Sequence, residues 1–205
     1  MADRYPEITI ESREQWRAWL DEHHATEPGV WVTTYKRRSG RPQVSIGDIV
    51  EEALAYGWVD SRPRSVDDQR SQRLVTPRKP TSKWSKVNKQ RVKGLIASGA
   101  MTPAGLAAVE LAKRTGTWTA LDEVEELREP TELRAALDAA PSARRHWDAF
   151  PRSTKRAILE WIASAKTSAT REKRIAETAT QAAQNIRANQ WRQPKRATAP
   201  AHPDA

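Results

Sequence analysis

The first part of the chain alternates between strand-like and helix-like patterns of hydrophobic residues. Short runs rich in β-branched and aromatic residues, at positions 8–10 and 30–35, predict strands. After each run, apolar residues recur at intervals of three and four, which predicts helices that begin after Ser12 and after Ser45. Gly57 is typical of the residue that ends the second of these helices. The order of the elements indicates a unit of mixed α and β structure.

The pattern becomes extended over residues 58–78, which carry no helical stripe. A turn at residues 67–68, where two aspartates stand together, would divide this stretch into two strands. The next helix is expected to be capped by Thr81 or Ser82 and to run to about Ser98.

The last third of the chain looks wholly helical. Residues 130–189 carry helical stripes that are punctuated by prolines, and the segment after them is rich in proline and poor in apolar residues. The expected fold class is α+β, with a small N-terminal sheet packed with helices followed by a small all-helical C-terminal unit. We expect an α+β unit at 1–120, a helical domain at 128–189 and a disordered tail at 190–205.

Composition narrows the picture in two ways. The chain has no cysteine, which excludes disulfides, thiolate metal sites and a cysteine nucleophile. The first residues do not show the basic and apolar regions of a signal peptide, and no apolar run reaches the length of about 18 residues that a membrane span needs. The expected location is therefore the cytoplasm, with no membrane span.

The positive charge is concentrated in one segment. The whole chain has a net charge of +9, and residues 62–93 alone carry eleven Lys or Arg against two Asp. That segment therefore accounts for the entire excess. Such a cluster creates a local field that attracts anions. The alternative is a solvated face that keeps the protein soluble.

Three stretches of the N-terminal half and one of the C-terminal half carry a family resemblance. VEEALAYGWVDSR (50–62), QRLVTPRKPTSKWSKVNKQRV (72–92), GAMTPAGLAAV (99–109) and AILEWIASAKTSATREKRI (157–175) follow one another along the chain. Together they resemble the YdeI/OmpD-associated family, also labelled bacteriocin-protection, over roughly residues 5–190. The resemblance implies a role in resistance or protection against stress, and it implies no settled reaction.

Polar side chains gather at the ends of the elements predicted for the N-terminal unit. Lys36 ends a strand, Asp60 follows the end of a helix, and Arg78 precedes the start of the next one. Such positions on a rigid scaffold often carry binding groups. The candidate ligand-binding residues are Lys36, Asp60, Arg78, Lys79, Trp84, Ser85 and Asn88. Five of these are predicted to line a single concavity, namely Lys36, Asp60, Arg78, Trp84 and Asn88.

The prolines on either side of Arg78 and Lys79 fix the backbone, so both side chains are expected to be held outward. The helix start that follows would offer free backbone N–H groups to an anion. The alternative for this run is an exposed, solubilising linker. Asp60 has an alternative as well, in which it pairs with a nearby arginine and holds the turn.

Trp84, Asn88 and Arg91 share one face of the predicted helix. Asn88 and Arg91 interrupt an otherwise apolar stripe, and buried polar groups need hydrogen-bond partners. Asp60 or Glu51 is expected to supply them, either in a structural network or in the wall of a polar pocket.

Three functions are compatible with these patterns. The first is a protection protein, without enzymatic activity or weakly catalytic, that binds an anionic ligand at residues 58–91. The second is a nucleic-acid-binding protein, which would use the basic segment and a basic tail at Arg192, Lys195 and Arg196. The third is an enzyme in which Asp60 acts with Lys36 or Arg78.

No residue is assigned a catalytic role, and no cofactor or metal site is predicted. The histidines show no metal-ligand spacing, and the chain has no GxSxG, Walker A or GxGxxG motif. The pattern of residues leaves the oligomeric state open.

Overall fold

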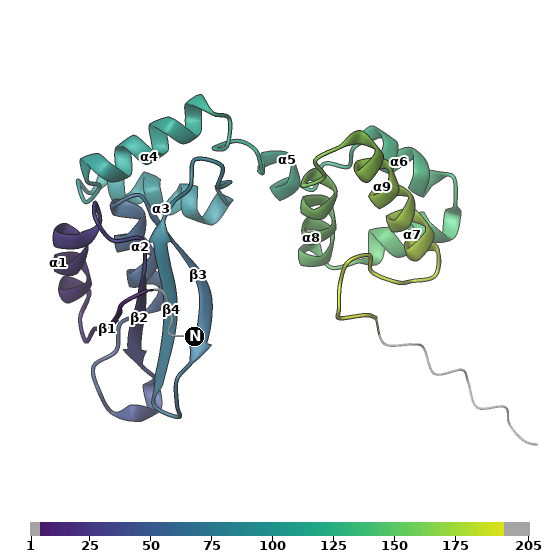
Figure 1. Ribbon diagram of the computed structural model, residues 1–205. Helices are drawn as coiled ribbons and strands as arrows, with labels where there is room; N and C mark the ends of the chain where they lie inside the picture. The colour runs from purple at the N-terminus through teal and green to yellow at the C-terminus, as the bar shows by residue number, and fades with distance from the viewer. Residues whose placement is uncertain (1–4, 195–205) are drawn as a thin grey trace, which may run out of the picture. The chain divides into compact units, whose positions relative to one another are not determined.

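The computed structural model describes residues 5–194 of the chain, which divides into two compact units, Met1–Leu121 and Asp122–Ala205 (Figure 1). The first unit contains a four-stranded sheet packed with helices, and the second is helical. This confirms the predicted α+β fold class. The predicted tail falls largely outside the described residues, since 195–205 are not among them.

The sheet of the first unit has the strand order β1-β2-β4-β3. Strand β1 pairs with β2 in parallel, while β4 pairs with both β2 and β3 in antiparallel fashion. The strands are β1 (Glu7–Thr9), β2 (Val30–Tyr35), β3 (Trp58–Ser65) and β4 (Arg70–Pro77). Asp67 makes the turn of the β3–β4 hairpin, because its Oδ1 accepts hydrogen bonds from the backbone N–H groups of Gln69 (2.8 Å) and Arg70 (2.7 Å).

The two faces of the sheet are covered in different ways. Side chains alternate along a strand, so Val30 and Val32 of β2 point to one face and join the core formed with the helices. Trp31 points to the other face and is nevertheless buried, at 3% exposure. Long side chains of β3, which lies beyond β4 in the sheet, cover it, since the guanidinium groups of Arg64 and Arg62 lie 4.3 Å and 5.8 Å from its ring centre.

Four helices and a short 3-10 turn complete the first unit. They are α1 (Arg13–His23), η1 (Arg37–Ser39), α2 (Ile46–Ala55), α3 (Lys86–Ala97) and α4 (Pro103–Arg114). Helix α2 is central, because it packs against α1, α3, α4 and strand β3 (Figure 1). Ser45 and Asp48 form a full capping box at its start.

Tryptophans supply much of the core of the first unit. Trp16, Trp58 and Trp84 are almost fully buried. The indole N–H of Trp16 donates to the Ile49 carbonyl (3.0 Å), and that of Trp58 donates to the His24 carbonyl (3.1 Å). Large rings therefore fill the core without leaving these polar atoms unpaired.

A buried carboxylate joins α1 to α2. Glu52 of α2 is 3% exposed, and it accepts hydrogen bonds from Arg13 Nε (2.6 Å) and Arg17 (2.8 Å) of α1. Arg13 also reaches Asp48 and Glu51, each at 3.1 Å. A charge removed from water needs such pairing, so this network fixes how α1 lies on α2.

The start of α3 differs from the prediction. The N-cap is Ser85, and Thr81 and Ser82 lie in a non-helical segment before it. Trp84 is responsible, because its ring is buried and its backbone N–H donates to the Thr117 carbonyl at 3.3 Å. The chain is thus held extended until Trp84 has entered the core, and the helix begins directly afterwards.

The second unit is built from five helices within the described residues. They are α5 (Asp122–Glu125), α6 (Thr131–Asp138), α7 (Pro141–Ala149), α8 (Arg152–Ala163) and α9 (Ser168–Ala183). Leu133, Leu137, Trp147, Ile158 and Ile162 are almost completely buried and form the centre of its own core. None of the described helices in either unit is long and apolar enough to cross a membrane.

The network at Glu52 leads to a prediction about stability. Glu52→Gln removes the buried charge that pairs with Arg13 and Arg17, so the free energy of unfolding should fall by about 3 kcal/mol in urea titrations. Glu51→Gln is the matched control, because Glu51 neighbours Glu52 but is 34% exposed and, among residues 5–194, bonds to Arg13 alone. Its effect should stay below about 1 kcal/mol. Equal effects of the two substitutions would contradict this account.

Candidate functional site

The strand register separates the residues that were predicted to converge. The backbone N–H of Lys36 bonds to the Gln69 carbonyl at the tip of the hairpin (2.7 Å), whereas Asp60 lies opposite Val75. The strand between Gln69 and Val75 spans about 20 Å. Arg78 lies still further along, just after β4. The prediction that Lys36 shares one concavity with Asp60, Arg78, Trp84 and Asn88 is therefore wrong.

Arg78 does not point outward as predicted. Its guanidinium lies 3.8 Å from the ring centre of Trp84 and donates to the Lys83 carbonyl at 3.2 Å. Its Nε atom is buried without a hydrogen-bond partner among the described residues. Burial lowers the pKa of Arg78 to about 10, while the nearby Asp60 carboxylate raises it. Arg78 is thus a half-buried cation that braces the chain between β4 and α3, whereas Lys79 is exposed.

Ser85 and Asn88 make hydrogen bonds at the start of α3. The Ser85 hydroxyl accepts the backbone N–H of Asn88 (3.3 Å), and Asn88 Oδ1 accepts a hydrogen bond from Arg91 (3.3 Å). Asp60 pairs with Arg73 at 2.8 Å, which is the structural alternative considered for it. Each of these residues therefore bonds to a side chain or backbone group close to it in space, and the described cavities do not include Asp60, Ser85 or Asn88.

Lys36 lies in a cavity of about 470 Å³, which we call the basic cavity. It opens on the helix-facing side of the sheet, between the hairpin and the start of α2. The residues that line it are Thr34, Lys36, Ile46, Ile49, Pro63, Arg64, Ser65, Ser71, Gln72 and Arg73. The register explains the grouping, because Thr34, Ser71 and Ser65 follow one another across three strands and therefore point to the same face.

The basic cavity combines cations with hydroxyl groups. Lys36 and Arg73 contribute cationic side chains, and none of the described residues that line the cavity is acidic. The guanidinium of Arg64 lies on the opposite face of the sheet, over Trp31. Lys36 Nζ donates to Ser65 Oγ (3.0 Å) and to the Asp67 carbonyl (2.5 Å), both of which are uncharged oxygens. Arg73 is held in place by Asp60. The charge of Lys36 is therefore not neutralised by these contacts, and the cavity presents a positive field to solvent.

Sequence reasoning found Lys36 and missed the rest of this lining. The signal was present, because polar residues at alternate positions, such as 34 and 36 or 71 and 73, share one face of a strand. The pairing of β4 between β2 and β3 then brings these pairs together.

The structure also divides the basic segment into two parts. Arginines of the hairpin are paired with carboxylates, as in Arg64–Glu7 (2.8 Å), Arg70–Asp67 (2.7 Å) and Arg73–Asp60 (2.8 Å). The lysines lie on and before α3. The net charge of +9 counted along the sequence is thus partly compensated around the hairpin.

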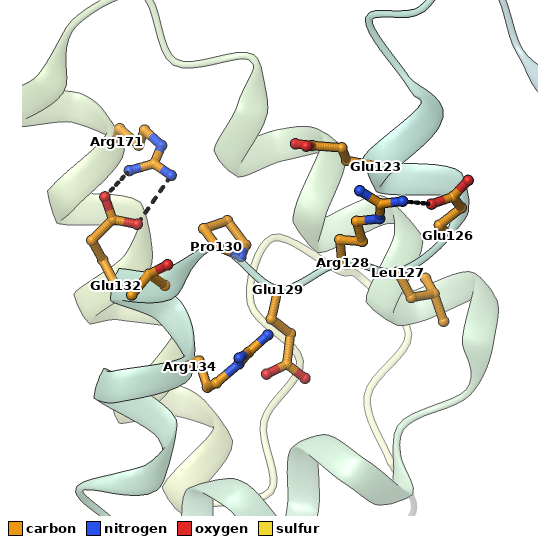
Figure 2. Close-up of a pocket in the computed structure, with 10 residues that line it drawn as sticks. Glu123, Glu126, Leu127, Arg128, Glu129, Pro130, Glu132, Arg134 and Arg171 are labelled. Atoms are coloured by element: carbon orange, nitrogen blue, oxygen red, sulfur yellow. Dashed lines mark hydrogen bonds and ion pairs between the residues drawn. The ribbon is translucent and has the colours of Figure 1, made fainter.

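A cavity of about 650 Å³ lies in the second unit, around the loop between α5 and α6 (Figure 2). Its charged residues largely bind one another. Arg171 donates to both oxygens of Glu132 (3.0 and 3.3 Å), and Arg128 pairs with Glu126 (2.7 Å), as Figure 2 shows on opposite sides of the loop. Little charge remains to attract a ligand.

Glu129 anchors that loop to the core of the second unit. Its carboxylate accepts hydrogen bonds from both terminal nitrogens of Arg144 (2.7 and 2.8 Å) and from the indole N–H of Trp147 (2.7 Å). The Arg144 bonds lower the pKa of Glu129, and the Trp147 bond adds to the effect. The Glu129 carboxylate therefore holds α7 against the loop, since both Arg144 and Trp147 belong to α7.

Comparison with protein families gives two matches. Residues 126–185 match the family described as Bacteriocin-protection, YdeI or OmpD-Associated (OmdA). This segment of the chain is therefore similar to the YdeI/OmpD-associated domain. The resemblance found in the sequence is confirmed for this part of the chain. Residues 8–108, which include the stretches at 50–62 and 72–92, match a different family, described as Domain of unknown function (DUF8412).

No curated protein and no solved structure matched the chain. The Glu129 anchor and the cavity of Figure 2 lie within or beside the YdeI/OmpD-associated domain, whereas the basic cavity lies in the segment that matches the domain of unknown function. Among the described residues, no group of three His, Asp or Glu is placed to hold a metal ion. Of the basic tail proposed to contact nucleic acid, Lys195 and Arg196 lie outside the described residues.

The stacking of Arg78 on Trp84 changes what a substitution should do. Arg78→Ala should lower the free energy of unfolding by about 1–2 kcal/mol, because it removes a cation–π contact and the packing of the side-chain stem. Lys79→Ala is the control, because Lys79 is the exposed neighbour, and its effect should lie within about 0.5 kcal/mol. Urea unfolding measures both. An Arg78→Ala protein as stable as the control would show that the stack is not structural.

Glu129 makes the YdeI/OmpD-associated domain sensitive to acid. A carboxyl whose pKa is lowered on folding stabilises the folded state above its ordinary value of 4.5 and loses that contribution as the pH falls through the folded pKa. Glu129→Gln should therefore lower the free energy of unfolding by about 2 kcal/mol at neutral pH, with a difference that shrinks below pH 4.5.

Urea unfolding of the full chain, followed by NMR signals of the second unit, measures this difference at several pH values. Glu132→Gln is the control, since Glu132 pairs with Arg171 at an exposed position. A deficit of Glu129→Gln that stays constant down to pH 3 would contradict the assignment.

Proposed function

We propose that the N-terminal unit binds a small anionic ligand in the basic cavity, and that this binding serves a protective role. One observation carries the proposal. Two cationic side chains, Lys36 and Arg73, line one cavity with the hydroxyls of Thr34, Ser65 and Ser71, and no acidic residue belongs to its described lining. This is the donor set that phosphate and carboxylate groups require.

The groups of the cavity are held before a ligand arrives. Ser65 and the Asp67 carbonyl hold the Lys36 ammonium, and Asp60 holds the Arg73 guanidinium. Preorganised donors lose less entropy on binding. In this proposal Asp60 positions Arg73, which replaces the hypothesis that Asp60 is a general base.

The wall of the cavity limits the class of ligand. Ile46 is 58% exposed at the start of α2, and Ile49 and Pro63 also line the cavity. The volume of about 470 Å³ falls in the range of small-molecule sites. We therefore favour an anion with a compact organic body, such as a sugar phosphate or a nucleotide, over a bare inorganic ion.

The protective role rests on the description of the matched family alone. The words bacteriocin-protection belong to the YdeI/OmpD-associated domain, and the ligand would bind in the other unit. In the proposal, the first unit recognises an anion and the second contributes whatever contact protection requires.

Lys36→Ala tests the site. In isothermal titration at low salt, a panel of sugar phosphates and nucleotides should include a ligand whose affinity falls about tenfold in this variant, since a charge-assisted bond is lost. Lys79→Ala is the matched control, because it removes the same charge from an exposed position that does not line the cavity. Its affinity should stay within about twofold of the wild type.

Two results would overturn the proposal. One is a complete lack of binding across the panel at low ionic strength. The other is an equal loss in Lys36→Ala and Lys79→Ala, which would show that the ligand responds to overall charge. A steep fall of affinity with salt that follows the number of lysines removed would instead indicate a polyanion such as nucleic acid.

A further inference from the structure

A second hollow of the first unit has a different chemistry. It is a groove of about 440 Å³ between α3 and α4. Val92 and Val109 are buried beneath it, Trp118 is half-buried in it, and Ile96 is 49% exposed at its edge. The interior of the groove is therefore formed mainly by hydrocarbon and one indole ring, and Gln90 is its uncharged polar lining residue.

Lysines surround this apolar groove. Lys86, Lys89 and Lys93 follow one face of α3 at intervals of three and four, and Lys113 comes from the last turn of α4. The ammonium group of Lys89 lies 5.5 Å from the ring centre of Trp118. None of the described lining residues is acidic, and Glu110, which does not line the groove, pairs with Lys113 at 2.7 Å.

We propose that this groove binds a small amphipathic anion, in which a hydrocarbon chain or aromatic ring carries one carboxylate, sulfate or phosphate group. Ile96 and Trp118 contact the apolar body, whose burial supplies the affinity. The lysine stems extend the apolar wall while their ammonium groups remain at the rim, where they meet the anionic head.

The volume of the groove and the positive charge at its rim favour a small amphipathic anion. The volume lies in the range of small-molecule sites, and the exposed apolar surface is limited to a few side chains, whereas a stable protein interface buries roughly 1,200 Å² or more. The rim charges are all positive, which excludes cationic amphiphiles and disfavours neutral ones. The groove differs from the basic cavity in having an apolar interior without hydroxyl groups.

Decanoate is a suitable probe, used below the concentration at which it forms micelles. Titration calorimetry with the full chain compares it with decanol and decyltrimethylammonium, whose hydrocarbon chains are similar in length. Decanoate should bind at least about tenfold more tightly than either, because only its head group complements the lysine rim. Equal affinity for the three probes would overturn the proposal.

Ile96→Glu locates the site. The substitution places a negative charge at the edge of the groove and should weaken decanoate binding by about tenfold or more. Val87→Glu is the matched control, since Val87 lies on the same helix with 53% exposure and does not line the groove. The affinity of Val87→Glu for decanoate should equal that of the wild type. Both variants should have the melting temperature of the wild type, because both positions are exposed.

Further measurements distinguish this groove from the basic cavity and from a dimer interface. Lys36→Ala should leave decanoate binding unchanged, so the groove and the basic cavity can fail independently. Decanoate binding that survives Ile96→Glu would overturn the proposal. Sedimentation velocity that shows a dimer disrupted by Ile96→Glu, together with no decanoate binding, would also overturn it and identify a second copy as the occupant.

Discussion

The buried carboxylate of Glu52 is the constraint on which the first unit depends. A charge that is withdrawn from water must be paired, and Arg13 and Arg17 supply that pairing from another helix. The position of α1 on α2 is thereby fixed by directed bonds in addition to apolar contacts. Helix α2 in turn packs on α3, α4 and β3. The basic cavity at the start of α2 and the groove between α3 and α4 therefore rest on one arrangement of helices.

Local patterns predicted the elements whose signals are carried by neighbouring residues. The strand at residues 30–35, the hairpin turn at Asp67 and the cap at Ser45 all follow from residues within a few positions. The start of α3 does not, because Thr81, Ser82 and Ser85 offer similar caps. The burial of Trp84 decides between them, and burial depends on Thr117 and the core, far along the chain.

Only part of the lining of the candidate site was predicted from the sequence. The count of basic residues predicted an anion site at residues 58–91, which stays a prediction, and Lys36, named as a candidate outside that segment, lines the basic cavity. The assumption that the ends of these elements lie close together was wrong for Lys36. Lys36 lies beside the turn of the hairpin, whereas Arg78 follows the opposite end of β4. Pairings such as Arg64–Glu7 and Arg73–Asp60 join positions far apart in sequence, so the sequence counts the charges without showing which are compensated.

The type of cation matters as much as the number. Guanidinium groups are weakly hydrated and stack on rings, as Arg64 does on Trp31 and Arg78 does on Trp84. Ammonium groups are more strongly hydrated, and the lysines of the basic segment at 62–93 lie on and just before α3. An approaching anion is therefore drawn first toward α3, where counterions can be released into solution, while the arginine-rich hairpin adds little to the speed of the encounter.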